Sequence, residues 1–416
     1  MRVKDPFDEI NLAKRKAVLY TVCGLVVVVA YATVFPTQLA LVAMIFAFIL
    51  MIMLHEFGHF IMAKRAGMKV TEFFVGFGPR LWSVTRGETE YGVKAFPLGG
   101  YCKVIGMTNL EEVAPEDEPR TYRAKRWGPK VVMAAAGPAV HFIIAIVLLF
   151  CVVFFAGDYR NERQTTTLQK VGQGAEAAGV RAGDQVVAID GTPVHAWSQV
   201  STLITGPAGH KRVAGDTVRV EVRRGAQVLD FVVTLQPSTD TGPKRVVAGI
   251  VSHVVVPKLG FFAAVVAAPR QVGEVGWESV KALGSMFSPS GISNYFRILS
   301  GDKSTNTDQS KRFVSPVGFG QLANSAVKSG WVTAFGLLIA INIFVGLFNL
   351  LPLLPFDGGH IAIATYEQIA SRIRRRRVQV DMAKLMPLTV GVLAVLAFIF
   401  LSSLFLDITH PVANPF

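Results

Sequence analysis

The sequence has few of the charged residues that keep a soluble domain in solution. Only 17% of its 416 residues are charged, whereas 51% are hydrophobic, and the mean hydropathy is +0.43. This composition excludes an ordinary soluble globular protein and predicts membrane spans. The sequence also has only three cysteines, Cys23, Cys102 and Cys151. Their scattered positions exclude a disulfide framework and a cysteine-based zinc site.

Five apolar runs are long enough to cross a bilayer as helices. They lie at 17–35, 39–63, 131–156, 331–351 and 385–406. The net charge of +13 could indicate nucleic-acid binding. In a membrane protein, however, lysine and arginine gather in cytoplasmic loops, so we expect the lipid bilayer and no nucleic acid as a partner.

The basic clusters also predict the orientation of the spans. They precede the first and third runs, follow the second, and lie between the fourth and fifth, the last one at Arg372–Arg377. All of these positions fall on one side, which we therefore expect to be the cytoplasm, with the C-terminus outside. The first run, with its basic start and Ala30-Tyr31-Ala32, is also compatible with a cleaved signal peptide, and its removal would leave the later topology unchanged.

The segments between the spans have their own patterns. Residues 70–105 predict a β-hairpin that turns at Arg86-Gly87-Glu88, and Gly99-Gly100 permits a close approach of backbone. Residues 165–237 alternate in strand fashion and resemble a PDZ domain, which the topology places outside the cytoplasm. Within 258–312, LGFFAAVVAA is too short to span, 272–287 predicts an amphipathic helix at the outer membrane surface, and 301–312 predicts a linker.

The most informative stretch is LHEFGHF at residues 54–60, near the end of the second apolar run. On a helix His55 and His59 project from one face, so both imidazoles can reach one zinc ion, and the adjacent Glu56 can act as general base. Ionisable residues at this depth are costly unless a partner or a cation offsets the cost. The pattern therefore predicts a catalytic zinc site that needs a third protein ligand.

A candidate for that ligand lies in FNLLPLLPFDGGH, at the cytoplasmic end of the fourth run. Asp357 falls at the same expected depth as the two histidines, and its carboxylate suits zinc. Pro352 and Pro355 must break the helix here, and broken backbone at membrane depth is tolerated only where it lines a cavity or packs in protein.

Together these motifs resemble the site-2 proteases, and the actinobacterial branch in particular. The resemblance covers about residues 40–406 and includes Ala136-Gly137-Pro138, Asn349-Leu350-Leu351-Pro352 and the segments 74–79 and 96–100. It implies that His55, His59 and Asp357 bind Zn²⁺, that Glu56 is the base, and that Asn349, Gly99 and Gly100 contact the substrate. His141, where the family usually has asparagine, is expected to be a packing residue rather than a ligand, and His360 a residue near the site.

The resemblance also implies a function. We expect a multi-pass plasma-membrane endopeptidase that cuts single-span proteins, such as anti-sigma factors, after a first extracytoplasmic cut. Two other readings are a catalytically silent scaffold that uses its PDZ domain, and a metal transporter. The intact Glu56 argues against the first. The second would need further acidic or histidine residues, and the outer halves of the second to fourth runs have none apart from His141, which lies nearer the inside.

The expected fold is a polytopic α-helical membrane protein of about five spans, with a membrane-associated β-hairpin on the cytoplasmic side and an inserted extracytoplasmic PDZ domain. Its active site faces the cytoplasm. The expected parts are 1–38 (tail and extra span), 39–69 (span with HExxH), 70–130 (hairpin and cytoplasmic loop), 131–156 (span), 165–237 (PDZ domain), 258–312 (surface helices and linker), 331–360 (span with the third ligand) and 385–406 (last span).

Overall fold

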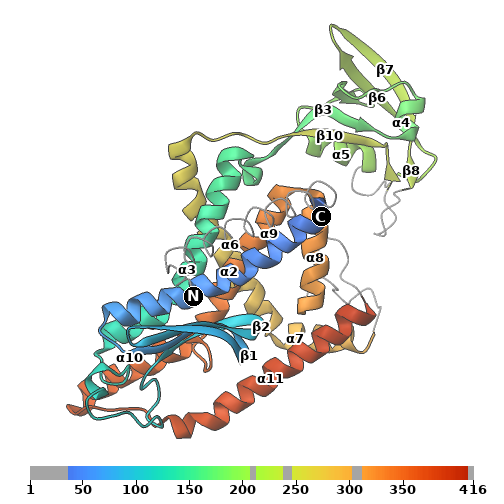
Figure 1. Cartoon of the computed structure of the whole chain (residues 1–416). Coiled ribbons are helices and arrows are strands. Elements are labelled where there is room, and N and C mark those ends of the chain that lie inside the picture. The colour runs from blue at the N-terminus through green and yellow to red at the C-terminus, as the bar shows by residue number, and fades with distance from the viewer. Residues whose placement is uncertain (1–35, 207–211, 238–245, 302–311, 411–416) are drawn as a thin grey trace, which may run out of the picture. The chain divides into compact units, whose positions relative to one another are not determined.

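The computed structural model describes residues 36–206, 212–237, 246–301 and 312–410 (Figure 1). The first predicted span, 17–35, and most of the predicted linker 301–312 lie outside these residues. The chain divides into two compact units, and we describe each by itself. Unit 1 is formed by residues 1–150 and 265–416, and unit 2 by residues 151–264.

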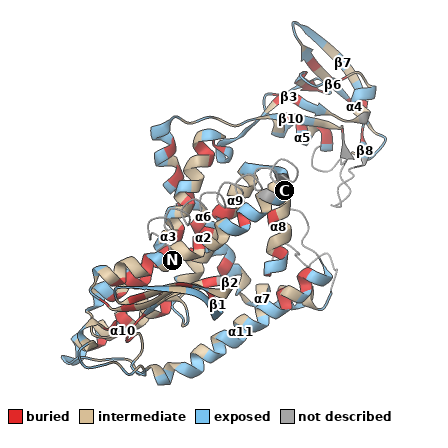
Figure 2. Ribbon diagram, in the orientation of Figure 1, coloured by how far each residue is buried: buried red, intermediate tan, exposed pale blue. Residues whose placement is uncertain are grey.

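Four long helices of the described chain are apolar enough to cross a membrane. Their apolar windows have mean hydropathies of 2.2 to 2.8 and lie where four of the five predicted spans were expected. The helices are α2 (Pro36–Arg65), α3 (Trp127–Phe155), α9 (Trp331–Asn349) and α11 (Met382–Thr409). Most of α11 is exposed, as Figure 2 shows, which is typical of a surface that faces lipid.

The predicted hairpin is present as β1 (Val70–Arg86) and β2 (Thr89–Val104). Its strands meet in the turn around Gly87, where the positive φ of 64° suits glycine. The hairpin is folded on itself, because Glu72 pairs with both Lys103 and Glu90. The segment 100–104 therefore pairs with 70–75 on one side and forms an edge of the sheet.

Further helices complete unit 1. The sequence predicted a short apolar segment followed by a surface helix at 272–287, and the structure joins both in α6. Neither α8 nor α10 was expected from the sequence. The bounds are α6 (Phe261–Met286), α7 (Pro289–Leu299), α8 (Pro316–Ser329) and α10 (Asp357–Arg374), with a single 3-10 turn at Glu118–Arg120.

The region 331–360, expected as one part, holds the end of one helix and the start of another. The helix α9 ends at Asn349, and α10 begins at Asp357. The break contains Pro352 and Pro355, and proline cannot donate the backbone hydrogen bond that would continue a helix. Asp357 therefore stands at the first turn of α10 rather than at the end of a span.

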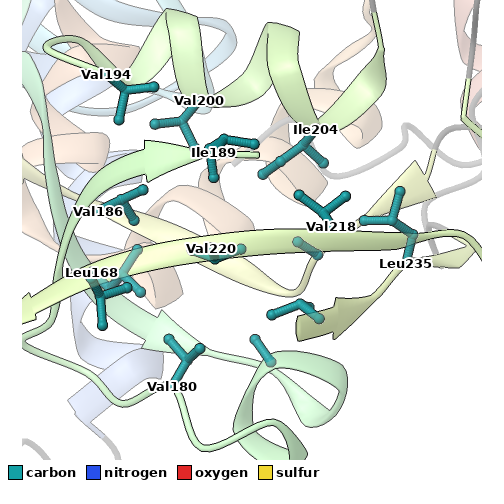
Figure 3. Close-up of a cluster of buried hydrophobic side chains, with 14 residues drawn as sticks. Leu168, Val180, Val186, Ile189, Val194, Val200, Ile204, Val218, Val220 and Leu235 are labelled. Carbon is teal, nitrogen blue, oxygen red and sulfur yellow. The ribbon is translucent and has the colours of Figure 1, made fainter. Parts of the chain in front are cut away.

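Unit 2 has its own sheet and hydrophobic core. The strands lie in the order β10-β3-β4-β6-β7, and β5 pairs with β4. Valine, isoleucine and leucine side chains fill the interior between the sheet and the helix α5 (Trp197–Thr205) (Figure 3). The other bounds are β3 (Arg163–Val171), α4 (Gln173–Ala177), β4 (Gln185–Ile189), β5 (Thr192–Pro193), β6 (Thr217–Arg224), β7 (Gln227–Thr234), β8 (Gln236–Pro237), β9 (Val246–Val247) and β10 (Ile250–Val255), with a 3-10 turn at Tyr159–Asn161.

The strand β10 lies beyond the expected range 165–237. It pairs with β3, so that Val255 lies opposite Arg163. The points at which the chain enters and leaves this sheet are therefore adjacent. The backbone N–H of Asp158 also donates to the carbonyl of Pro257, at 2.8 Å. An insertion with adjacent ends can be accommodated in a chain without disturbing the elements on either side.

Candidate metal centre

Three potential metal ligands converge in unit 1. The Nε2 atoms of His55 and His59 lie 3.2 Å apart. The carboxylate of Asp357 lies 3.3 Å from each of them, through Oδ2 to His55 and through Oδ1 to His59. Both histidines are buried, with exposed fractions of 7% and 8%.

The local sequence explains this convergence. His55 and His59 are four residues apart on the uninterrupted helix α2, so they lie on one face, one turn apart. Asp357 stands at the start of α10, directly after the proline-containing break. Because α9 stops before this point, the chain can turn and aim the carboxylate at α2.

The donor atoms of these three side chains are spaced as the ligands of one metal ion are. Two ligands at about 2.0–2.1 Å from a tetrahedral zinc ion lie about 3.3 Å from each other. The separations of 3.2 Å between the two Nε2 atoms and of 3.3 Å from each of them to one of the two oxygens of Asp357 are close to that value. Two imidazoles and one carboxylate also form a ligand set that catalytic zinc uses, with the fourth position open.

The carboxylate of Asp357 is suited to be a ligand. Both of its oxygens face the Nε2 atoms of the two histidines. One of its oxygens, Oδ2, is buried and has no hydrogen-bond partner in the described residues. A buried, unsatisfied carboxylate oxygen is costly, and a bound cation would remove this cost.

A backbone carbonyl orients His59. The Nδ1 atom of this ring lies 2.7 Å from the carbonyl oxygen of Met133 on α3 and donates to it. The Nε2 lone pair is then free to face Asp357 and His55. This arrangement is the usual way in which a protein sets the tautomer of a metal-binding histidine.

Gly137 has a role that the sequence analysis did not assign. A Cβ atom at this position would lie 2.4 Å from Nε2 of His59 and 2.6 Å from Cε1 of His55. The backbone of α3 therefore lies directly against both rings, and only glycine fits there. Its presence in the Ala136-Gly137-Pro138 motif was the available signal, but the motif alone does not show what the glycine contacts.

The edge of β2 approaches Glu56. The backbone N–H of Cys102 lies near the Glu56 carboxylate. A Cβ atom on Gly100 would lie 3.4 Å from Cγ of Glu56. Gly100, one of the predicted substrate-binding residues, is thus adjacent to the predicted base, whereas Gly99 packs against the ring of Phe77.

The other predicted residues are not among the three ligands. The ring of His141 lies 4.9 Å from that of His55, and its Nδ1 is 3.1 Å from Oδ1 of Asn342. His360 packs edge-on against Tyr122, with their ring centres 6.1 Å apart. Asn349 is the last residue of α9, and its side chain has no hydrogen-bond partner among the described residues.

A membrane-embedded HExxH helix whose histidines meet a carboxylate from a second helix is typical of a metal-dependent peptidase. The chain belongs to Peptidase family M50, whose sequence profile matches residues 43–398. This match confirms the resemblance to the site-2 proteases.

The chain is similar over nearly its whole length to two curated relatives from actinobacteria. It is 35% identical to zinc metalloprotease Rip1 of Mycolicibacterium smegmatis over 408 residues, which cover 88% of this chain and 96% of that relative. It is 33% identical to zinc metalloprotease Rip1 of Mycobacterium tuberculosis over 417 residues, which cover 91% of this chain and 98% of that relative. The expected likeness to the actinobacterial branch is thus confirmed.

Proposed function

We propose that this chain is a zinc-dependent endopeptidase that cleaves the transmembrane segments of single-span proteins inside the bilayer. The observation that carries the proposal is the triangle of His55, His59 and Asp357, because its separations fit zinc and it lies at a membrane-spanning helix. The name of the Rip1 relatives, zinc metalloprotease, supports the choice of metal.

Each residue of the centre then has a chemical task. His55, His59 and Asp357 hold the ion, which when bound acts as a Lewis acid and lowers the pKa of a coordinated water to about 7. Glu56 accepts the proton from the attacking water and passes it to the nitrogen of the leaving amine. We assign the N–H of Cys102, which lies near this carboxylate, to orient Glu56 during the transfer.

The edge of β2 is suited to hold the substrate. A transmembrane helix hides its amides in its own hydrogen bonds, so it must unwind before cleavage. An unwound segment can pair with the free edge at residues 100–104 as an added strand, and Gly99 and Gly100 leave room for its backbone. We assign Asn349 to bind the substrate backbone or the oxyanion.

The distribution of charge supports a cytoplasmic active site in the plasma membrane. Lys64 and Arg65 end α2, four basic residues at 123–130 lie at or just before the start of α3, and the arginine run 372–377 precedes α11. By the positive-inside rule this end of the spans, with the hairpin and the metal centre, faces the cytoplasm. Unit 2, which we propose to be a PDZ domain, then lies outside.

We further propose that the substrates have already been shortened outside the membrane, as anti-sigma factors are when a first protease cuts them. Unit 2 would then act as a gate that obstructs a long external segment and admits a short one. The alternative is that it recruits the new C-terminal carboxylate of the trimmed substrate.

The decisive experiment separates holding the metal from moving the proton. Purified Glu56→Gln should keep about one zinc per chain by elemental analysis and lose proteolysis of a membrane-embedded reporter. His55→Ala, His59→Ala and Asp357→Ala should lose both. Loss of zinc from Glu56→Gln, or cleavage by it at the wild-type rate, would contradict the assignment of roles.

A further inference from the structure

The helix α10 has an apolar face that no described part of the chain covers. It lies between α9 and α11 in the sequence but is not among the candidate spans. Tyr366, Ile369 and Ile373 follow one another at spacings of three and four residues, so they share a face, and they are 54%, 53% and 77% exposed. An apolar stripe of this kind is typical of a helix that lies in the membrane surface.

A basic cavity lies on the other side of the same helix. It has a volume of about 410 Å³, is open to solvent on one side, and lies between α10, the start of α3 and the segment 377–379. Its cationic lining residues are Lys125, Arg126, Lys130 and Arg377, and its only acidic lining residue is Glu367.

The walls of this cavity are held by specific contacts. Nζ of the buried Lys130 lies 2.9 Å from a carboxylate oxygen of Glu367. The indole Nε1 of Trp127 donates to Oγ1 of Thr365, at 3.2 Å, and joins α3 to α10. Nη2 of Arg377 donates to the carbonyl of Arg123, at 2.8 Å. A cavity with such walls exists before any ligand arrives.

The charge in the cavity is not balanced. Lys130 is neutralised by Glu367, whereas Lys125, Arg126 and Arg377 form no ion pair within the described residues, although Arg377 lies within the electrostatic reach of Glu118. Three further arginines at 374–376 are exposed and form no ion pair there. A ligand of this cavity must therefore be negatively charged.

The position of the cavity adds a second requirement. Trp127 both lines the cavity and begins the apolar span of α3, and it is 44% exposed. Tryptophan at the end of a span is typical of the level of the lipid headgroups. The cavity thus opens where a bilayer presents its headgroups, on the opposite face of α10 from the apolar stripe.

We propose that this cavity binds the headgroup of an anionic phospholipid, while the apolar stripe of α10 lies in the surrounding leaflet. Basic pockets between helices at a membrane surface are suited to such headgroups, since each cation strengthens binding to anionic lipid. This site is separate from the metal centre, and it does not depend on the proposed proteolysis.

The test uses the full-length protein in neutral detergent, titrated with short-chain phosphatidylglycerol and followed by native mass spectrometry. We expect saturable binding of phosphatidylglycerol, and at least tenfold weaker binding of phosphatidylcholine with the same chains. The double variant Arg126→Gln, Arg377→Gln should bind phosphatidylglycerol roughly 25-fold more weakly, because each cation near an anionic lipid changes affinity about fivefold.

Two matched variants keep this test decisive. Arg181→Gln, Arg223→Gln removes the same charge from exposed positions in unit 2 and should bind as the wild type does. Arg126→Lys, Arg377→Lys keeps the charge in the cavity and should retain most of the binding, which excludes simple misfolding. Equal binding of both lipids, equal binding by the Gln variant, or displacement of the lipid by inorganic phosphate alone at equal concentration would overturn the proposal.

Discussion

Gly137 shows how closely the metal centre is packed at the scale of single residues. Its Cα has no side chain, and the two histidine rings occupy the space where a Cβ would stand. The same helix face also supplies the carbonyl of Met133 that orients His59. The α3 backbone is therefore part of the centre, although it contributes no ligand.

We predict that Gly137→Ala weakens zinc binding by at least about tenfold, because the new methyl group must push His55 or His59 out of the triangle. The matched control is Gly128→Ala in the same helix, where a Cβ would meet nothing within 4 Å. Zinc affinity measured by competition with a chelator checks both variants. Wild-type affinity in Gly137→Ala would show that the rings can move without loss.

At the scale of elements, an ion pair with a buried carboxylate joins two segments of unit 2. Asp184, before β4, is buried, and Arg224, at the end of β6, contacts both of its oxygens at 2.7 Å. The same guanidinium donates to the carbonyl of Gly179. The hydrogen bonds of Arg224 hold the pKa of Asp184 below its usual range.

We predict that Arg224→Ala destabilises unit 2 by about 2 kcal/mol, since a buried carboxylate loses its charged partner. The stabilisation comes from a lowered carboxylate pKa, so it is present above about pH 4 and is lost as the pH falls through the lower folded value. Hydrogen exchange of β4 and β6 at pH 7 and at pH 3 measures it. Arg223→Ala, one position earlier and exposed, is the control and should leave exchange unchanged.

At the scale of the whole molecule, the first prediction concerns sidedness. Arg374→Cys should not react with an impermeant maleimide in intact cells and should react after permeabilisation, whereas Arg223→Cys in unit 2 should react in intact cells. The native Cys102 should contribute little background, because burial and the nearby charge of Glu56 raise its pKa to about 12. Labelling of Arg374→Cys from outside would reverse the proposed orientation.

The second prediction concerns the gate. Deleting residues 163–255 and joining the ends with a short Gly-Ser linker should preserve cleavage of a trimmed substrate and permit cleavage of the untrimmed one. These bounds follow from the structure, because Arg163 lies opposite Val255 and the ends of the deletion therefore meet. A reconstituted assay with both substrate lengths checks it, and loss of cleavage of the trimmed form would favour recruitment over gating.

The sequence by itself determined the elements whose rules are local. Run length identifies helices that can span a membrane, alternation and Arg86-Gly87-Glu88 identify the hairpin, and the four-residue spacing of His55 and His59 places them on one face. Asp357 was also identifiable, because a carboxylate beside a proline break at the end of a span needs a partner. It lies about 300 residues from His55, yet residue chemistry was sufficient to pair them.

Only the tertiary structure decided which backbone surrounds those ligands. Three features join residues that are distant in the chain. Gly137 packs against the histidine rings, the N–H of Cys102 lies near Glu56, and the basic cavity forms between α3 and α10. The helices α8 and α10 were likewise not predicted from the sequence, because short amphipathic helices between spans give a weak periodic signal. Local patterns specify which face of an element is apolar or polar, whereas packing between distant elements determines what that face meets.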